Sequence, residues 1–370
     1  MVSKRTSKKA RQKMSQTPGL RYQQALSTLR SETSPSPVQS VWFTALGIDN
    51  LATFDPSPAW AAGEFDSHFR FTVGHQPDDP ANGVDIDLAE PRAGGAGTHV
   101  CIQGIAGSGK STLLSGLVLG ACARYSPSKL NFVLMNFTGS YTFRDFDKLP
   151  HVLANFSYMQ ERADAVRQAT AAITAEIDRR EALLTQHQVS SIVDYRAKRA
   201  AAADLYPPLP ELAIAVDEVG EFLAAAECVE FERLLGRLVG VRRALGIHLI
   251  LSSQVLRQPR FPSPMQHFTY AISLRVGAAG QSQYLLDADD AATLPIGSGA
   301  ALMRTFPGEG LVAFNSFDSA APMPGEDFRG IRERDALLRR LNSYTVDDLG
   351  DRTLADALAD VELRHPHRRW

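Results

Sequence analysis

The pattern of apolar residues indicates a chain that alternates strands and helices through its central part. Short, nearly continuous apolar runs are typical of strands that are buried on both faces of a parallel sheet. Five such runs are expected as strands: residues 99–103, 130–135, 212–216, 248–253 and 270–276. Three longer stretches between them are expected as helices: residues 113–125, about 158–187 and about 221–244. We therefore predict an α/β fold with a mostly parallel sheet covered on both sides.

The segments that flank this core follow other patterns. Residues 1–39 combine a basic, helix-prone arm with a Ser- and Pro-rich linker. In residues 40–97, short apolar runs separated by Pro, Gly and Asn clusters predict a small antiparallel strand layer beside the main domain. Residues 98–316 are expected to form the core, which ends in a hairpin, and residues 317–370 are expected to be a C-terminal helical segment.

Charge is distributed unevenly along the chain. The formal net charge is -2, but residues 1–30 contain eight basic residues and no acidic one, which leaves 31 basic against 41 acidic residues in the remainder. The acidic balance of this remainder argues against a ring whose pore encloses DNA. The basic arm could still hold phosphates of a nucleic acid, tether the chain to an anionic membrane, or act as a solubilising tail. These three interpretations of the arm remain open.

Cysteine usage and hydropathy indicate the cellular compartment in which the chain is expected. Cys101, Cys122 and Cys228 lie far apart and lack metal-ligand spacing, so we expect buried thiols in a reducing compartment. The most apolar helix candidate, residues 113–123, is shorter than the roughly 20 residues that cross a bilayer. The expected location is cytoplasmic, with a peripheral position at the inner face of the cell membrane as the alternative, where contact would run through partners or the basic arm.

The stretch GIAGSGKST at residues 104–112 satisfies the pattern G-x-x-x-x-G-K-[ST] between a predicted strand and a predicted helix. Such a loop surrounds a phosphate with backbone N–H groups, and the helix that follows adds its positive N-terminal dipole. Lys110 is expected to reach the β- and γ-phosphates of ATP, and Ser111 to offer its hydroxyl to Mg²⁺. The predicted nucleotide-binding residues are Gly104, Ala106, Gly107, Ser108, Gly109, Lys110, Ser111 and Thr112.

Two further polar groups are expected at the same edge of the sheet. Asp217 and Glu218 directly follow the apolar run 212–216, where Asp217 can hold the hydrated Mg²⁺ and Glu218 can deprotonate the attacking water. Gln254 follows the run 248–253 and can emerge beside Glu218, near the γ-phosphate. The alternatives are that Asp217 caps the next helix and that Gln254 is a surface residue of a loop.

In its motifs the sequence resembles the FtsK/SpoIIIE family of motor ATPases, within the RecA-like P-loop group, over about residues 41–316. The motifs that carry this resemblance are GIAGSGKST, KLPHV, EIDRREALL, AVDEVGEFL, RRALGIHLILSSQ, LRV and DAATLPIGSGAAL. A narrower resemblance, to the ATPase modules of EccC in type VII secretion, rests on SVWFTAL, FTVGHQPDDPANGVDIDL and DYRAKRA. The family often has an Asp and a Lys after its second core strand, where this chain has Asn136 and Thr138.

The resemblance implies a ring of homologous or identical subunits in which an arginine of one subunit completes the site of its neighbour. Arg243 and Arg275 are the positions that we expect for this role, and a solvated or ion-paired arginine is the alternative for each. The predicted function is an ATP-hydrolysing motor that translocates a polymer, with protein export of the EccC type favoured. The alternatives are a double-stranded DNA translocase, for chromosome or plasmid transfer, and an adaptor that binds nucleotide without hydrolysing it.

Overall fold

The structure is a computed structural model of the chain. It describes residues 40–64, 66–156, 163–220, 229–241, 243–256, 268–306, 308, 310–324, 330–344 and 352–364. The chain divides into a large compact unit, Val41–Ala321 with Arg332–Trp370, and a small unit, Met1–Ser40 with Pro322–Ile331. In the small unit, a backbone hydrogen bond of 2.8 Å joins the nitrogen of Met323 to the carbonyl oxygen of Ile331. All elements that follow belong to the large unit.

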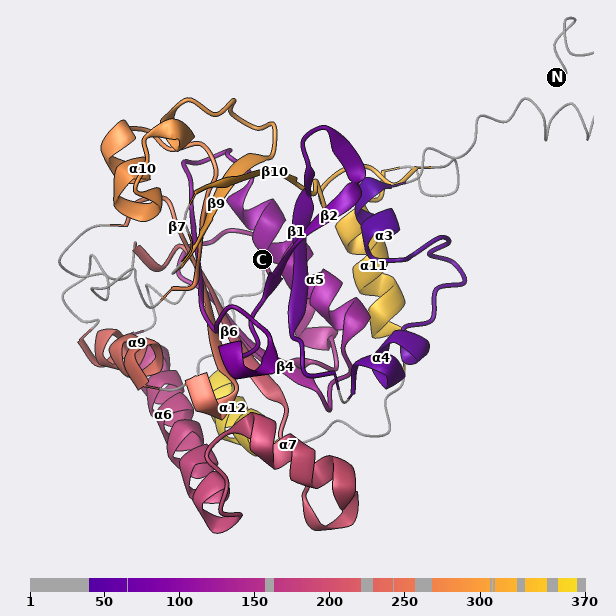
Figure 1. The fold of residues 1–370 in the computed structure, drawn as a ribbon, viewed down its shortest axis with the longest axis vertical. Helices are drawn as coiled ribbons and strands as arrows, with labels where there is room; N and C mark the ends of the chain where they lie inside the picture. The colour runs from indigo at the N-terminus through magenta and orange to yellow at the C-terminus, as the bar shows by residue number, and fades with distance from the viewer. Residues whose placement is uncertain are drawn as a thin grey trace, which may run out of the picture. The chain divides into compact units, whose positions relative to one another are not determined.

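Helices and strands alternate along the large unit, as Figure 1 shows. The α-helices are α3 (Val41–Ala45), α4 (Ser57–Gly63), α5 (Lys110–Arg124), α6 (Ala163–Gln186), α7 (Ile192–Ala201), α9 (Val229–Val241), α10 (Ala279–Leu286), α11 (Glu333–Asn342) and α12 (Thr353–Arg364). Short 3₁₀-helices are η1 (Pro91–Ala93), η2 (Phe146–Lys148), η4 (Ala203–Leu205), η5 (Arg243–Leu245) and η7 (Asp290–Ala292). The strands are β1 (Arg70–Gln76), β2 (Asp79–Asp87), β3 (Val100–Gln103), β4 (Leu130–Asn136), β5 (Val152–Phe156), β6 (Glu211–Asp217), β7 (Ile247–Ser253), β8 (Tyr270–Ser273), β9 (Ala300–Thr305) and β10 (Val312–Ser316).

In the described part of the chain, ten strands form one sheet in the order β2-β1-β10-β9-β8-β3-β7-β6-β4-β5. The pairs from β8 through β3, β7, β6 and β4 to β5 are all parallel, whereas β9, β10, β1 and β2 extend the sheet in antiparallel fashion. The central strand β3 pairs with β7 on one side and β8 on the other. The carboxyl ends of β3, β6 and β7 therefore meet at one edge of the sheet.

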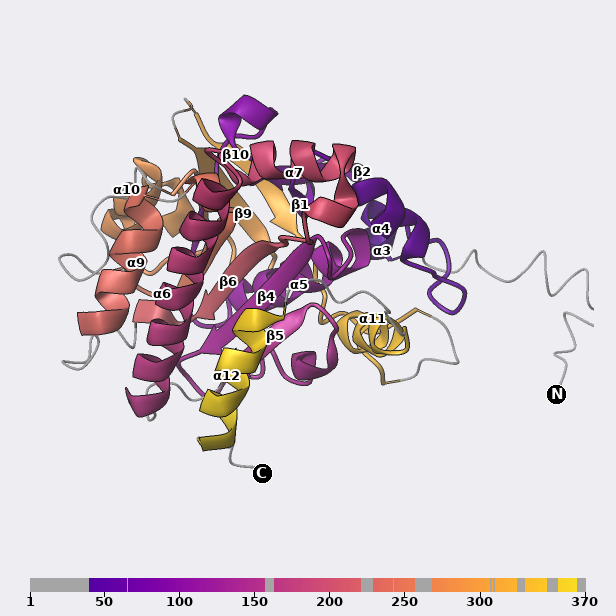
Figure 2. The same cartoon turned by 90° about the horizontal axis from the view of Figure 1, so that it is seen from below.

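Helices cover both faces of this sheet. Every residue of β4, β6 and β7 is buried, as expected for strands covered on both sides. Figures 1 and 2 show α6, α9 and α12 on one face and α5 with α11 on the other. The core on the first face joins Cys101 of β3 and Leu251 of β7 to Ile177 of α6 and Leu358 of α12. The structure thus confirms the α/β fold with a mostly parallel sheet.

The five strands expected from apolar runs are present, while β5 and α7 were not expected from the sequence. β8 ends at Ser273, before the predicted end at residue 276. The next two residues still bond to the end of β3 and the loop after it: Leu274 N donates to the carbonyl oxygen of Gln103 at 2.9 Å, and Ile105 N donates to that of Arg275 at 2.8 Å. The predicted helices at 158–187 and 221–244 are observed as α6 and α9, although residues 158–162 and 221–228 lie outside the described residues.

The N-terminal part of the large unit joins the main sheet. The antiparallel strands expected in residues 40–97 are β1 and β2, and they continue the sheet through β10 instead of packing beside it. Divisions of the chain at residues 97 and 316 stay a prediction. The hairpin near residue 316 and the two C-terminal helices are observed as β9–β10, α11 and α12.

Two of the three cysteines lie within the described residues. Cys101 and Cys122 are free and buried, and burial raises the pKa of both thiols far above the usual value. They are small apolar core residues, as predicted, while Cys228 lies outside the described residues. Of the helices that the structure describes, none combines the length and the apolar composition needed to span a bilayer.

Candidate functional site

The loop between β3 and α5 is shaped by its glycines. Gly109 caps α5 with a φ of +105°, in the left-handed region that side chains rarely adopt. A Cβ on Gly104 would lie 2.5 Å from the Ser108 hydroxyl and 3.2 Å from the Leu274 Cβ. The loop therefore turns tightly against the neighbouring strand, and the first amides of α5 face the space in front of it. This arrangement has the geometry that a phosphate-binding loop needs, and the assignment of that role to residues 104–112 stays a prediction.

Lys110, the first residue of α5, contacts the acidic residue at the end of β6. Its Nζ lies 3.2 Å from the Oε1 of Glu218, and both side chains are buried. Gln254, directly after β7, donates its backbone N–H to Oε2 of Glu218 at 3.2 Å and its side-chain amide to Oε1 at 3.3 Å. Three residues predicted for the site thus meet around one carboxylate.

Asp217 lies fully buried at the end of β6, and its two carboxylate oxygens differ in their surroundings. Oδ2 accepts hydrogen bonds from Thr142 at 2.5 Å and Ser140 at 3.1 Å, and a longer one from Ser111 at 3.5 Å. Oδ1 has no hydrogen-bond partner among the described residues. A buried carboxylate oxygen without a partner beside a serine hydroxyl fits the hydration shell of Mg²⁺, which prefers oxygen ligands.

A cavity of about 500 Å³ opens in front of these residues, within the range of pockets for small molecules. The predicted residues that line it are Ala106, Gly107, Gly109, Lys110, Ser111, Thr112, Glu218 and Gln254. Gly104, Ser108 and Asp217 lie outside this lining, where the first two shape the loop and Asp217 contacts Ser111. The structure therefore brings the predicted nucleotide, metal and water-activating residues together.

The far wall of the cavity was not predicted. It consists of the loop before β9 and of the end of β10 with the residues that follow it, namely Gly297, Ser298, Gly299, Ser316, Phe317 and Asp318. A Cβ on Gly297 would lie 3.8 Å from the carbonyl oxygen of Gly107, so the two glycine-containing loops run close to each other. The sequence offered one signal for this wall, the PIGSG stretch at 295–299, which was identified as a motif without a role.

Arg275, one of the two predicted arginines, is not among the residues that line this cavity. Arg275 donates from Nη1 to the Leu294 carbonyl at 3.0 Å, a contact within the chain. Arg243 begins η5, and its side chain lies outside what the structure describes. A role of either arginine toward a neighbouring subunit stays a prediction.

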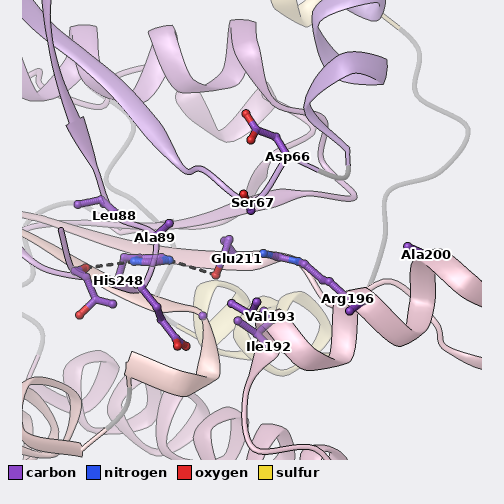
Figure 3. Close-up of a pocket in the computed structure, with 14 residues that line it drawn as sticks. Asp66, Ser67, Leu88, Ala89, Ile192, Val193, Arg196, Ala200, Glu211 and His248 are labelled. Atoms are coloured by element: carbon purple, nitrogen blue, oxygen red, sulfur yellow. Dashed lines mark hydrogen bonds and ion pairs between the residues drawn. The ribbon is translucent and has the colours of Figure 1, made fainter. Parts of the chain in front are cut away.

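A second, smaller cavity of about 200 Å³ lies at the opposite edge of the sheet, where β6 and β7 begin. Figure 3 shows Arg196 and His248 on two sides of Glu211. Nη1 of Arg196 lies 2.5 Å from one carboxylate oxygen of Glu211, and Nε2 of His248 lies 3.1 Å from the other. Burial acts to raise the pKa of Glu211, but Arg196, the hydrogen bond from His248 and Lys129 outweigh it and hold the pKa far below its usual range. Since this basic cluster pairs with Glu211 inside the chain, it offers little to a phosphate.

The fold and the first cavity together define a P-loop ATPase. A glycine loop leads from β3 into α5, the buried acidic pair Asp217 and Glu218 lies at the end of β6, two strands away, and the residues predicted to hold the metal and to activate water share one edge of the sheet. The chain belongs to the FtsK/SpoIIIE family, whose model matches residues 64–287.

Known relatives with similar sequence come from secretion systems. The chain is 37% identical over 287 residues to the ESX-4 secretion system protein EccC4 of Mycobacterium tuberculosis, covering 77% of this chain and 23% of that protein. It is 34% identical over 348 residues to the ESX secretion system protein EccC of Thermomonospora curvata, covering 88% and 26%. The solved cytoplasmic domain of the Type VII Secretion ATPase EccC from T. curvata matches with a TM-score of 0.76 and 31% identity, over 85% of this chain and 35% of that one. The chain thus spans about a quarter of the length of these curated relatives.

Proposed function

We propose that this chain binds ATP with Mg²⁺ in the cavity beside the phosphate loop, hydrolyses it, and uses the energy to move a polymer. The observation that carries the proposal is the meeting of Lys110, Glu218 and Gln254 at the edge of one 500 Å³ cavity. Residues 98–316 would form the motor core. Copies of this chain, or related modules, would assemble into a ring whose arginines complete neighbouring sites.

Nucleotide binding would use the phosphate loop and a change of partner at Lys110. The amides of residues 106–111 and the dipole of α5 favour an anion in front of them. Lys110 now pairs with Glu218, so it would exchange that carboxylate for the β- and γ-phosphates of ATP. Ser111 and Asp217 would hold Mg²⁺, which when bound neutralises charge on the phosphates.

Hydrolysis would then rest on the carboxylate that Lys110 releases. Glu218 would orient a water molecule and take its proton as the water attacks the γ-phosphorus and the bond to the bridging oxygen breaks, leaving ADP and phosphate. Gln254, hydrogen-bonded to the same carboxylate, would sense whether the γ-phosphate is present. An intact set of these residues favours hydrolysis over an adaptor that only binds nucleotide.

Protein export is the transport function that we favour. It is supported by the similarity to EccC proteins over 77% and 88% of the chain and by the acidic balance of the residues after position 30. Transport of double-stranded DNA is the second candidate, and the observation that favours it is the arm of eight basic residues within positions 1–30.

Nucleotide binding is tested by Lys110→Ala against Lys148→Ala, whose side chain is 64% exposed and lies in the surface pair with Asp145. We expect Lys110→Ala to weaken binding of a fluorescent ATP analogue by ~10–100-fold, the order expected for a charge-assisted contact, and to stop phosphate release. Lys148→Ala should behave as wild type, and circular dichroism should show both variants folded. Unchanged affinity in Lys110→Ala would refute the proposed site.

A further inference from the structure

The loop after β4 surrounds Asp217 with hydroxyl groups. Thr142 lies 75 positions before Asp217 in the sequence and is buried, and its hydroxyl donates to Oδ2 of Asp217 at 2.5 Å. Ser140 adds a bond of 3.1 Å to the same oxygen, and the Ser140 and Thr142 hydroxyls lie 2.8 Å apart. One oxygen of the carboxylate is therefore saturated by the chain itself, whereas Oδ1 has no partner among the described residues.

Asn136 fixes the shape of this loop. It ends β4, and its side-chain amide donates to the carbonyl oxygen of Ser140 at 2.9 Å and to the Ser140 hydroxyl at 2.6 Å. Its side-chain oxygen accepts from the backbone N–H of Thr138 at 2.8 Å. The loop is thus held at its start by an amide that directs the Ser140 hydroxyl toward Asp217.

A second support comes from the C-terminal part of the large unit. Arg334, in the first turn of α11, donates from Nη1 to the carbonyl oxygens of Tyr141 at 3.1 Å and Thr142 at 3.4 Å. Its backbone nitrogen donates to the carbonyl oxygen of Ser319 at 2.8 Å, and the Ser319 hydroxyl donates to the carbonyl oxygen of Thr112 in α5 at 2.9 Å. Ser319 and Arg334 lie outside residues 64–287, which the family model matches.

We propose that Thr142 is a positioning residue of the metal site, and that α11 holds it in place through Arg334. Thr142 fixes one oxygen of Asp217, so that the other faces the hydration shell of Mg²⁺, and the Ser319–Arg334 link ties this loop to the phosphate-loop helix. The inference rests on the proposed ATP site. It gives Ser319 and α11 a function: the metal site keeps its geometry only while α11 is docked against the loop after β4.

The test measures the Mg²⁺ concentration that gives half-maximal binding of a fluorescent ATP analogue, a readout that does not depend on turnover. Thr142→Val keeps the shape of the side chain and removes the hydroxyl, whereas Thr142→Ser keeps the hydroxyl. The matched control is Thr138→Val, because the Thr138 hydroxyl contacts Asn136 at 3.2 Å and not Asp217. Arg334→Met tests the support from α11.

Removing a group that orients a metal ligand typically lowers metal affinity ~10–100-fold. We expect Thr142→Val to raise the Mg²⁺ requirement by ~10-fold or more, without a change in the affinity for the analogue in EDTA. Thr142→Ser should stay within ~3-fold of wild type, Thr138→Val should match it, and Arg334→Met should raise the requirement ~3-fold.

A Thr142→Val variant with the wild-type Mg²⁺ requirement would overturn the inference and leave the ATP site intact. If Thr142→Val does not fold, Arg334→Met decides, and a wild-type requirement in that variant overturns the inference. A wild-type chain that binds no nucleotide at any Mg²⁺ concentration would refute the proposed function itself and this inference with it.

Discussion

Glu218 combines two features that a protein rarely places on one residue. Its backbone φ is +56°, in the left-handed region, and its carboxylate is buried against Lys110. A residue other than glycine in a sparsely populated backbone conformation costs on the order of 1–3 kcal/mol, which the surrounding structure must offset. The parallel strands β6 and β7 supply that support, because Gln254 at the end of β7 holds both carboxylate oxygens. In this backbone conformation, the Glu218 side chain lines the cavity.

His151 illustrates how burial of a single residue makes stability depend on pH. The ring is fully buried, its Nε2–H donates to the Tyr125 carbonyl at 2.7 Å, and it meets Trp60 edge to face. Burial lowers the pKa of His151 to about 4, Arg352 acts in the same direction, and the hydrogen bond opposes both. In the unfolded chain this histidine has an ordinary pKa near 6.5. Between pH 6.5 and pH 4 the unfolded chain is therefore protonated at His151, whereas the folded chain is not.

Stability should therefore fall as the pH drops from about 6.5 to about 4. This one group accounts for roughly 2–3 kcal/mol of that loss at pH 4.5. His151→Gln keeps the donor to Tyr125 but cannot be protonated, so its deficit relative to wild type should shrink by that amount between pH 7 and pH 4.5. Urea unfolding at both pH values measures it, with the partly exposed His75→Gln as control. An equal deficit at both values would show that His151 is not the titrating group.

At the scale of elements, apolar runs predicted the strands at the centre of the sheet because those strands are buried on both faces. β5 escaped prediction because its five residues include the polar Asn155 and follow a loop. The start of α7 could have been predicted from its capping residue. Ser191 is a favourable N-cap residue, and its hydroxyl oxygen accepts a hydrogen bond from the backbone N–H of Asp194. Local patterns of this kind are visible in a sequence once they are sought.

Some residues around the site belong to local motifs of the sequence, and others come together only through strand pairing. The phosphate loop, Asp217 and Glu218 could be predicted because their motifs are local and follow strands. Thr142 could not, because its contact with Asp217 depends on β4 lying beside β6 in register. The wall formed by Gly297–Gly299 and Ser316–Asp318 likewise depends on how β9 and β10 extend the sheet. Such pairings over long sequence distances become visible only in three dimensions.

At the scale of the whole molecule, the two transport proposals differ in the polymer that is moved, which is protein in one and double-stranded DNA in the other. Deleting residues 1–35 removes all eight basic residues of the arm and leaves the large unit, which begins at Val41. We expect the truncated chain to bind ATP as before and to show unchanged affinity for duplex DNA, while its binding to vesicles that contain anionic lipid falls. Sedimentation with vesicles and DNA titrations at several salt concentrations measure these effects.

Two results would favour DNA transport instead. If the deletion weakens duplex binding and flattens its salt dependence by nearly one logarithmic unit for each lost phosphate contact, the arm anchors DNA. If the truncated chain still binds duplex DNA tightly and with strong salt dependence, the DNA contacts lie in the motor core, and protein export loses its support.

The most direct test of the account compares ATP binding and single-turnover hydrolysis in wild type and Glu218→Gln. The amide keeps the size of the side chain but cannot take a proton from water and no longer competes as an anion for Lys110. We expect Glu218→Gln to bind ATP with Mg²⁺ at least as tightly as wild type and to hydrolyse it ~10²–10⁴-fold more slowly. Wild-type hydrolysis in this variant, or loss of ATP binding from it, would contradict the assignment of Glu218 as the base that Lys110 releases.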